Sequence, residues 1–290
     1  MRMSFIGAGK VGTSLGLYLK NKGFIISGYY SKSYASATNA GELTGSIPFR
    51  SLEELAVESD MIWITTNDDS IEEIGHQLAA LKCVSEGTII AHASGAHSSE
   101  ILAGLKERGC FIYSIHPLQA FAQVETAVEE LKATVFTIEG DQEKRALIKK
   151  IFNRTGNSCF IIEKEGKALY HAGACIMSNY LITLIDVALN LFQQAGLDRK
   201  KILEATRPLI MGTLNNIQLK DTKNALTGPI QRGDEVTIKN HIAAIGDNLP
   251  QEKEFYKFMG LKTLEMIKDS KSEEQIEMLM RLFEGGVYNE

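Results

Sequence analysis

A glycine-rich turn near the start of the chain has the spacing of a dinucleotide-binding loop. A short apolar run at residues 3–6 leads into Gly7, Gly9 and Gly12, and an apolar-periodic stretch follows. The first glycine of such a turn permits a tight bend, the second lets backbone approach a pyrophosphate, and the third lets helix pack against strand. The N–H groups of the helix start then bind the phosphates. The sequence therefore predicts dinucleotide contacts in this turn by Gly7, Gly9, Lys10, Val11 and Gly12; a turn without a ligand is the alternative.

The end of the second predicted strand, residues 24–30, indicates which dinucleotide binds. In NAD sites an acidic residue about 20 positions after the glycines holds the ribose 2′-hydroxyl. Here Ser31, Lys32 and Ser33 stand at that place, and no acid does. Two hydroxyls and one ammonium suit a 2′-phosphate through hydrogen bonds and charge. The pattern therefore predicts NADP(H) as the cofactor, with a polar surface turn as the alternative.

Polar side chains also follow three later predicted strands. The apolar run at residues 61–66 ends in Thr66, Asn67 and Asp68, which should line the cofactor cleft because ligands bind beyond strand C-termini. For Asp68, helix capping is the alternative. Ser94 and His116 follow the next two strands. An imidazole titrates near neutrality, so His116 could act as a general acid or base, or could simply bond to a loop carbonyl.

Strands alternate with helices up to residue 162, which predicts an α/β fold with a doubly wound parallel sheet. Helical periodicity then takes over. We therefore predict a dinucleotide-binding domain at residues 1–164 and an all-helical substrate and dimerisation domain at residues 165–290. The long apolar helix at 168–195 should be buried in a bundle or in the interface of a homodimer. Polar groups of this second domain that could meet a substrate, or merely other helices or solvent, are His171, Asn179, Arg232 and His241.

Composition narrows the class of partner. The 290 residues carry a net charge of −5, which argues against a nucleic-acid partner. No apolar run approaches the ~20 residues of a membrane span, so we expect no membrane partner. The four cysteines lack metal-site spacing, and the chain start lacks a secretory pattern. These features predict a cytoplasmic protein with reduced thiols and no metal.

The chain resembles a superfamily of two-domain reductases that comprises pyrroline-5-carboxylate reductase, prephenate dehydrogenase, ketopantoate reductase and the β-hydroxyacid dehydrogenases. More closely, it resembles the Rossmann-like NADP oxidoreductases whose C-terminal domain carries an unknown-function label (family 2520). The resemblance implies an N-terminal Rossmann domain and a helical, usually dimerising, C-terminal domain. The stretches that carry it are residues 7–12, 31–33, 92–96, 114–121, 170–180 and 226–234.

The resemblance also implies roles for single residues. Ser94 and His116 stand where prephenate dehydrogenases have a loop serine, which orients the reacting oxygen, and a His-Pro histidine, which polarises it. Ketopantoate reductase and the β-hydroxyacid dehydrogenases instead use a lysine four residues before an asparagine. Asn179 matches that asparagine, but Cys175 stands at the lysine position. Lys167 lies earlier on the same helix and is too distant to be a good replacement. This departure favours His116.

Together these features predict an NADPH-dependent reductase of a small 2-oxo or imino acid. His116 would donate the proton, Ser94 and Asn179 would bind the reacting oxygen, and Arg232 or His241 would hold the carboxylate. Ketopantoate is the first substrate to consider, because the family resembles proteins encoded beside pantothenate synthesis. A non-catalytic NADP-binding sensor or scaffold is one alternative, and a dehydrogenase of prephenate or pyrroline-carboxylate type is another.

Overall fold

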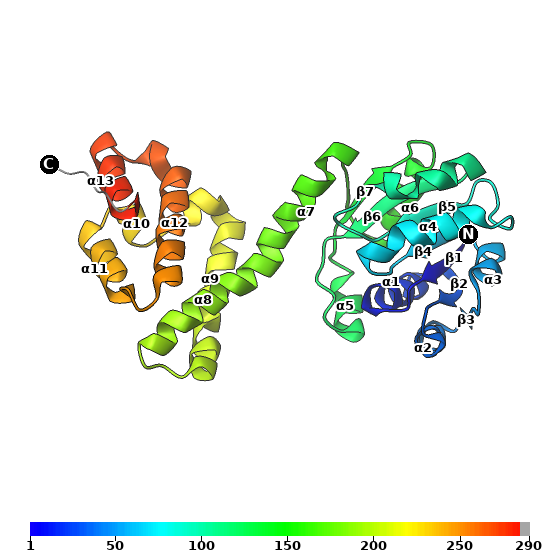
Figure 1. Ribbon diagram of the computed structural model, residues 1–290, viewed down its shortest axis with the longest axis horizontal. Coiled ribbons are helices and arrows are strands. Elements are labelled where there is room, and N and C mark those ends of the chain that lie inside the picture. Colours follow the sequence, from blue (N-terminus) through cyan, green and yellow to red (C-terminus); the bar gives the residue numbers. More distant parts are fainter. Residues whose placement is uncertain (285–290) are drawn as a thin grey trace. The chain divides into compact units, whose positions relative to one another are not determined.

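The central element is one mostly parallel sheet of eight strands. The computed structural model describes residues 1–284, and the chain divides after Asn179 into two units. The first unit holds the sheet, with strand order β3-β2-β1-β4-β5-β6-β7-β8 (Figure 1). Its strands are β1 Arg2–Ile6, β2 Ile25–Tyr30, β3 Ile47–Pro48, β4 Met61–Ile64, β5 Ile89–His92, β6 Phe111–Pro117, β7 Phe136–Gly140 and β8 Cys159–Ile161.

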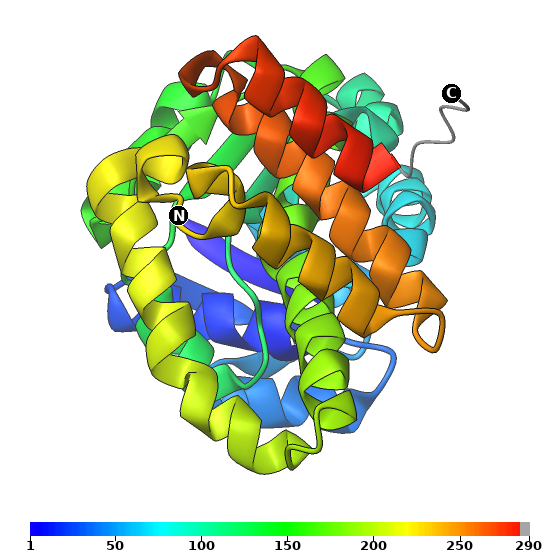
Figure 2. The same cartoon turned by 90° about the vertical axis from the view of Figure 1, so that its left-hand side faces the viewer.

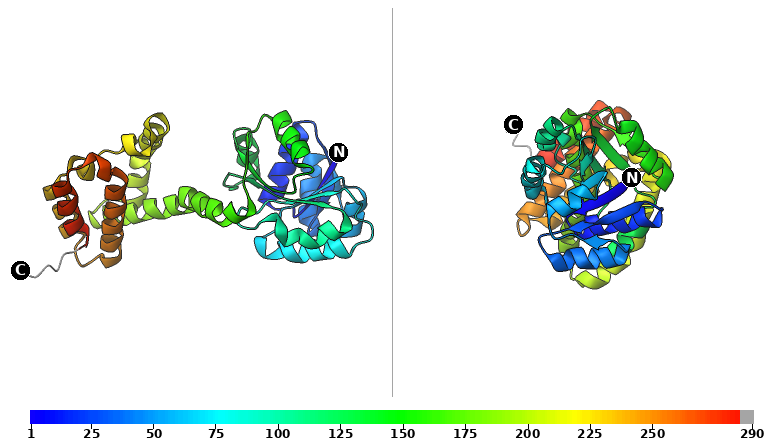
Figure 3. Two further views of the ribbon diagram at one scale, coloured as in Figure 1. Left: turned by 90° about the horizontal axis from the view of Figure 1, so that it is seen from above. Right: turned by 90° about the vertical axis from the view of Figure 1, so that its right-hand side faces the viewer.

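Helices cover both faces of this sheet (Figure 3). Side chains on β4 alternate between the two cores: Met61 and Trp63 pack into one, Ile62 and Ile64 into the other. All four are fully buried, as in a strand covered on both faces. This confirms the predicted doubly wound α/β fold. One core receives α1 Lys10–Asn21, α2 Tyr34–Thr44, α5 Val124–Glu130 and α6 Arg145–Thr155; the other receives α3 Leu52–Val57, α4 Ile71–Ala80 and the 3₁₀ helix η2 Ser99–Arg108.

The prediction of a wholly parallel sheet is wrong at one place, because β7 runs antiparallel to β6. Pro117, at the end of β6, pairs with Phe136, at the start of β7, and the Leu118 N–H donates to the Val135 carbonyl at 3.0 Å. The intervening segment, residues 118–135, therefore leaves β6 and enters β7 at the same end of this strand pair. In a parallel pair the segment would have to cross to the opposite end of the strands.

A long helical run begins at Lys164, without a break before Gln194. It comprises η3 Lys164–Gly166, α7 Lys167–Cys175, the π turn η4 Ile176–Tyr180 and α8 Leu181–Gln194. By length and composition alone this run could cross a membrane, although a helix of a soluble protein passes the same test. The expectation that no apolar run approaches that length is therefore wrong. Little of this run is buried within the described part of this single chain: Leu169 and Met177 are 80% and 78% exposed, and Lys167 and Leu189 are its buried members.

The second unit is helical throughout its described part. Its core joins Ile238, Leu264, Leu279 and Phe283 from three helices that pack together (Figure 2). Glycine and proline in residues 224–234 are typical of a loop, but Pro229 is pre-shaped for a first helical turn and begins a short helix there. The last helical stretch of the described chain divides in two at the 3₁₀ turn η5 Lys268–Ser270. The helices are α9 Arg199–Ala225, α10 Pro229–Arg232, α11 Glu235–Ile245, α12 Pro250–Ile267 and α13 Glu273–Glu284.

Candidate functional site

The three glycines of the first turn face different surroundings. Gly7 has a φ of +104°, and a Cβ there would lie 2.7 Å from the Thr65 carbonyl oxygen. A Cβ on Gly12 would lie 2.1 Å from the Gly7 carbonyl oxygen. These two positions must be glycine for the turn to pack on β4. At Gly9, by contrast, a Cβ would meet nothing within 4 Å. Gly9 is also the N-cap of α1, so its open side adjoins free helix N–H groups.

A pocket at the C-terminal ends of β1, β2 and β4 gathers most of the predicted cofactor residues. Gly7 and Gly9 line it together with Ser31, Lys32, Thr66 and Asn67. Lys32 is exposed, so its ammonium is accessible to a ligand. Five predicted residues are absent from this lining: Lys10, Val11 and Gly12 belong to α1, Ser33 caps α2, and the η1 helix, Asp68–Ser70, begins with Asp68.

The Ser94 hydroxyl is engaged within the protein. It donates to the Asp68 carboxylate at 2.9 Å and accepts from the N–H groups of Ala96 and His97 at 3.1 and 3.2 Å. A hydroxyl has one proton to donate, and here Asp68 receives it. Ser94 therefore connects the loop after β5 to the edge of the dinucleotide pocket. It could donate to a substrate oxygen only if this bond were given up.

A second pocket, of about 690 Å³, has His116 in its wall. The Nδ1 atom of His116 lies 2.8 Å from the Tyr170 hydroxyl, and the His171 ring stands edge-on to His116 at 6.1 Å. His171 in turn lies 3.5 Å from the Cys175 sulfur. These residues are all in the first unit, although the sequence analysis assigned α7 to the second domain. The remaining wall is largely apolar; its polar members beyond these four include Gln119, Ser178 and Asn179.

The His116 ring is neutral at physiological pH. Burial, and after it the positive charge of Lys167, lower the pKa of His116 to about 4. The phenol of Tyr170 also stays neutral, because burial raises its pKa. The Tyr170 hydroxyl interacts with Thr137 and lies within hydrogen-bond distance of the Nδ1 atom of His116. When the phenol donates to Nδ1, the imidazole proton sits on Nε2. That atom lies against Gly95, where a Cβ would come within 2.9 Å of it.

Lys167 is the residue whose importance the sequence analysis missed. Its side chain is 2% exposed, and its ammonium donates to the Ser94 carbonyl at 3.1 Å and to the Ser114 hydroxyl at 2.7 Å. Burial lowers the pKa of this lysine to about 8. The signal in the sequence was its position: no charged residue follows it until Asp186.

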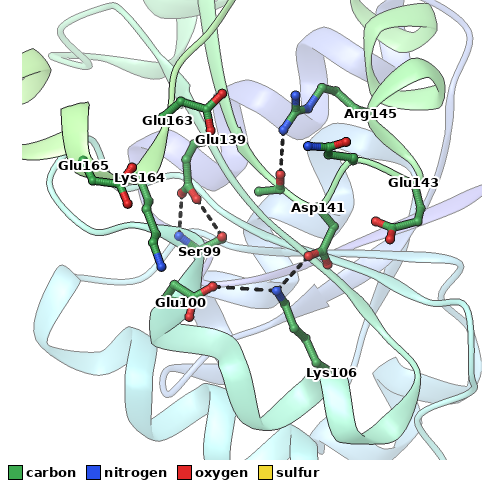
Figure 4. A pocket seen from close by; sticks show the side chains of 12 residues that line it. Ser99, Glu100, Lys106, Glu139, Asp141, Glu143, Arg145, Glu163, Lys164 and Glu165 are labelled. Atoms are coloured by element: carbon green, nitrogen blue, oxygen red, sulfur yellow. Dashed lines mark hydrogen bonds and ion pairs between the residues drawn. The ribbon is translucent and has the colours of Figure 1, made fainter.

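A third pocket is polar and lies where η2, β7 and the start of α6 meet (Figure 4). Its charged side chains bond mainly within the pocket wall. Lys106 pairs with Asp141 at 2.8 Å, and Glu139 accepts from the backbone and hydroxyl of Ser99 at 2.6 and 2.9 Å. The described residues include no group of three metal-ligating side chains here or elsewhere. Glu139 matters for the site above because its charge favours the protonated form of Lys167.

Two predicted substrate residues belong to the second unit. Arg232 ends the short helix α10, is largely exposed and lies 3.8 Å from the Asp234 carboxylate. The Nδ1 atom of His241 lies 2.8 Å from the Tyr256 hydroxyl, so this ring has a partner within its own unit. Each residue thus has a local contact, and a role in binding a substrate carboxylate stays a prediction for both.

The fold defines a Rossmann-like unit joined to a helical unit, and comparison with known proteins agrees. Residues 1–117 match the family model of a Rossmann-like domain, and residues 134–263 match that of a domain of unknown function, DUF2520. The chain therefore carries matches to both domain models in this order, as the motifs predicted. A search of curated proteins found no match.

Solved structures share the fold over nearly the whole chain. A candidate NADP oxidoreductase from Bacteroides fragilis is 22% identical, with a TM-score of 0.72 over 91% of this chain and 98% of that one. A protein from Thermotoga maritima is 25% identical, with a TM-score of 0.69 over 93% and 100%. An imine reductase from Myxococcus stipitatus, solved with NADP⁺, is 14% identical, with a TM-score of 0.67 over 97% and 99%.

The open side of Gly9 yields a prediction about binding without a change of fold. Gly9→Ala should lower the free energy of unfolding by about 1 kcal/mol or less, because its Cβ meets no protein atom. The same methyl group would block close approach of a pyrophosphate, so NADPH affinity should fall about tenfold or more. Gly12→Ala is the contrasting variant and should destabilise by about 1–3 kcal/mol or more. Denaturant unfolding and calorimetric titration measure both; unchanged NADPH affinity in Gly9→Ala would contradict the assignment.

Proposed function

We propose that this protein is an NADP(H)-dependent reductase that acts on the carbonyl or imine group of a small organic acid. One observation carries the proposal: Ser94 and Asp68 connect a glycine-lined pocket to the loop that lies against His116. A dinucleotide bound in the first pocket would reach toward the second. The similar imine reductase was solved with NADP⁺, which supports both this cofactor and this class of substrate.

The residues of the first pocket fit a phosphorylated dinucleotide. Gly9 leaves room for a pyrophosphate beside the free N–H groups of α1. Ser31 and Lys32 lie at the end of β2, where the 2′-phosphate of NADP(H) would bind, and they supply a hydroxyl and a positive charge. When bound there, NADPH would supply a hydride to the substrate carbon.

His116 and Tyr170 are suited to deliver the accompanying proton. In the neutral ring Nε2–H donates to the reacting oxygen or nitrogen while Nδ1 accepts from the Tyr170 hydroxyl. As negative charge develops on the substrate atom, the Nε2 proton moves to it and the phenol proton moves to Nδ1. Solvent then returns a proton to Tyr170. His116 thus acts as the general acid in its neutral form, with Tyr170 as its proton source.

The other polar residues of the site would orient the substrate. Asn179 and His171 share the pocket wall with His116 and are placed to bind polar atoms of the substrate. Ser94, whose hydroxyl bonds Asp68, would position the loop rather than hold the reacting oxygen directly. Arg232 or His241 would hold the carboxylate. Among possible acids ketopantoate is the first to test, followed by other 2-oxo acids and cyclic imines.

A non-catalytic NADP-binding sensor is the competing function, since fold alone does not determine activity. A dehydrogenase of prephenate or pyrroline-carboxylate type would run the same hydride chemistry in the oxidative direction. The apolar wall around His116 and Tyr170 favours an enzyme, because it keeps water from a reacting centre. Screening NADPH oxidation with 2-oxo acids and cyclic imines separates these functions. A sensor would bind NADPH tightly and turn over none of the substrates.

The proton-donor assignment predicts the effect of three variants on turnover. With the best substrate found, His116→Gln should lower kcat about 10²–10⁴-fold, because it removes the donor. Tyr170→Phe should lower kcat about tenfold or more, since the ring loses its proton source. His76→Gln, an exposed histidine on α4, serves as the control and should leave kcat unchanged. Full turnover by His116→Gln would overturn the mechanism.

The cofactor assignment predicts a selective loss of affinity. Lys32→Ala should weaken NADPH binding about 10–100-fold, the worth of a charge-assisted bond, and leave NADH binding unchanged. Lys20→Ala, which removes an exposed lysine of α1, is the matched control for net charge. Calorimetric titration of each variant with both cofactors measures the effect. Equal affinity of the unmodified protein for NADPH and NADH would refute the 2′-phosphate site.

We further propose that the protein is a homodimer whose interface covers the exposed apolar residues of α8 and α9. No described residue of α9 is buried within the chain, and Leu209 and Leu219 are 68% and 80% exposed. Ile182 on α8 is similarly exposed. Apolar surface on this scale marks an interface. A second copy of the chain carries the same apolar faces and would bury them by twofold symmetry. The cytoplasmic location stays a prediction from the sequence.

The dimer predicts a change of mass in solution. Light scattering should give twice the chain mass of 32.0 kDa for protein purified without detergent. Leu209→Lys with Leu219→Lys should shift the protein toward monomer, because each change places an ammonium in the apolar interface. Glu204→Lys, an exposed polar position of the same helix, should leave the dimer intact. A monomeric unmodified protein, or one soluble only in detergent, would contradict this proposal.

A further inference from the structure

We propose that Lys167 is a positioning residue of this site: its buried ammonium holds the Ser94 loop and keeps the His116 ring uncharged. The inference rests on the proposed reductase function, which requires a neutral His116 that donates from Nε2. Neither the composition nor the family motifs assign a role to Lys167. The role follows from the side chains and backbone that surround its ammonium.

The ammonium of Lys167 lies beneath the loop that connects the two pockets. It donates to the Ser94 carbonyl and to the Ser114 hydroxyl, and that hydroxyl donates to the same carbonyl at 3.1 Å. The three groups form a closed triangle that joins α7 to β6 and to the loop after β5. Gly95, the next residue of that loop, lies so close to the rings of His116 and His171 that a Cβ on it would come within 2.5 Å of His171 Nδ1 and 2.9 Å of His116 Nε2. Fixing the Ser94 carbonyl therefore fixes the surface on which these rings rest.

The charge of Lys167 is only partly balanced. Among the ion pairs of the described residues none involves Lys167, and the carboxylates that favour its charged form are Glu139 on β7 and, after it, Asp68 on η1. Glu139 is itself held by Ser99, so its charge is shared with two donors. A buried ammonium with such weak compensation repels a second positive charge nearby. The titratable groups that act on the pKa of His116 are Lys167, His171, Asp68 and His92, and of these only Asp68 favours a protonated ring.

This arrangement selects one protonation state of the His116–Tyr170 pair. A proton added to His116 would place a second cation in the buried cluster, and it would also remove the acceptor that Tyr170 uses. Lys167 therefore favours the neutral ring, in which Nδ1 can accept from Tyr170. An uncharged side chain that still donates a hydrogen bond would keep the loop contact and lose this effect of charge. The role thus separates into a hydrogen bond and a charge, and different variants test each.

The decisive experiment follows the titration of His116 in the protein alone, so it needs no substrate. Histidine-labelled protein is titrated by NMR, with the His116 resonance assigned from its loss in His116→Gln. In the unmodified protein His116 should titrate near pH 4. In Lys167→Gln, which keeps a donor to Ser94 but loses the charge, the titration should move up by about one pH unit or more. Lys164→Gln, three residues away and exposed, should leave it unchanged.

Lys167→Met provides a second variant that removes both the charge and the donor. It should raise the pH at which His116 titrates, as Lys167→Gln does. If the glutamine variant does not fold, this variant tests the effect of the Lys167 charge. An unchanged His116 titration in these variants would overturn the inference. Where a substrate is known, the acid limb of the kcat–pH profile should move upward with the titration. A purely structural lysine would lower kcat at every pH and move neither.

Discussion

The arrangement of the site depends on the bonds made by Ser94. Its hydroxyl reaches Asp68, beside the dinucleotide pocket, and its carbonyl accepts from Lys167, at the start of the long helix. Its N–H donates to the buried ring of His92 at 3.2 Å. With every polar group bonded, this residue connects the ends of β4, β5 and β6 to α7. The proposed reaction, in which the two pockets act together, depends on this loop being fixed.

Burying an ammonium to fix the loop has a cost in stability. The pKa of Lys167 is about 8 in the folded chain, below the ordinary 10.5. Between these values the unfolded chain binds more protons, so the free energy of unfolding rises with pH across this window. Below pH 8 Lys167 is protonated in both the folded and the unfolded chain, so the full destabilisation from burying its charge is present. A chain under selection for stability alone would place an apolar residue here, which is why the lysine points to function.

The fold was largely predictable from the sequence, because its signals are local. Apolar runs such as residues 61–64 give buried strands, and Gly7 and Gly12 sit where a Cβ would clash with β4 or with the turn itself. The direction of β7 was not predictable, because residues 118–135 carry no signal for the edge at which they re-enter the sheet. The exposure of the 164–194 helix was also misjudged, since periodicity reports an apolar surface and does not say what covers it.

The candidate site, like the fold, was predictable from the sequence only in part. Gly9, Ser31 and Lys32 were predictable because a dinucleotide loop has fixed spacing, and His116 because it ends a strand. Lys167 and Tyr170 were not, since they meet His116 only through packing of α7 against the sheet. The spacing of residues in a sequence shows which side chains are neighbours on one helix or strand. It does not show which residue of a distant helix contacts the end of a strand.

The central claim is that hydride passes from a nicotinamide to a small acid beside His116. The direct measurement is isotope transfer from NADPH deuterated at C4 to the best-bound 2-oxo acid or cyclic imine, followed by mass spectrometry of the product. We expect one deuterium on the former carbonyl or imine carbon from one of the two C4 epimers of the cofactor. Tight NADPH binding without label in any product would contradict it.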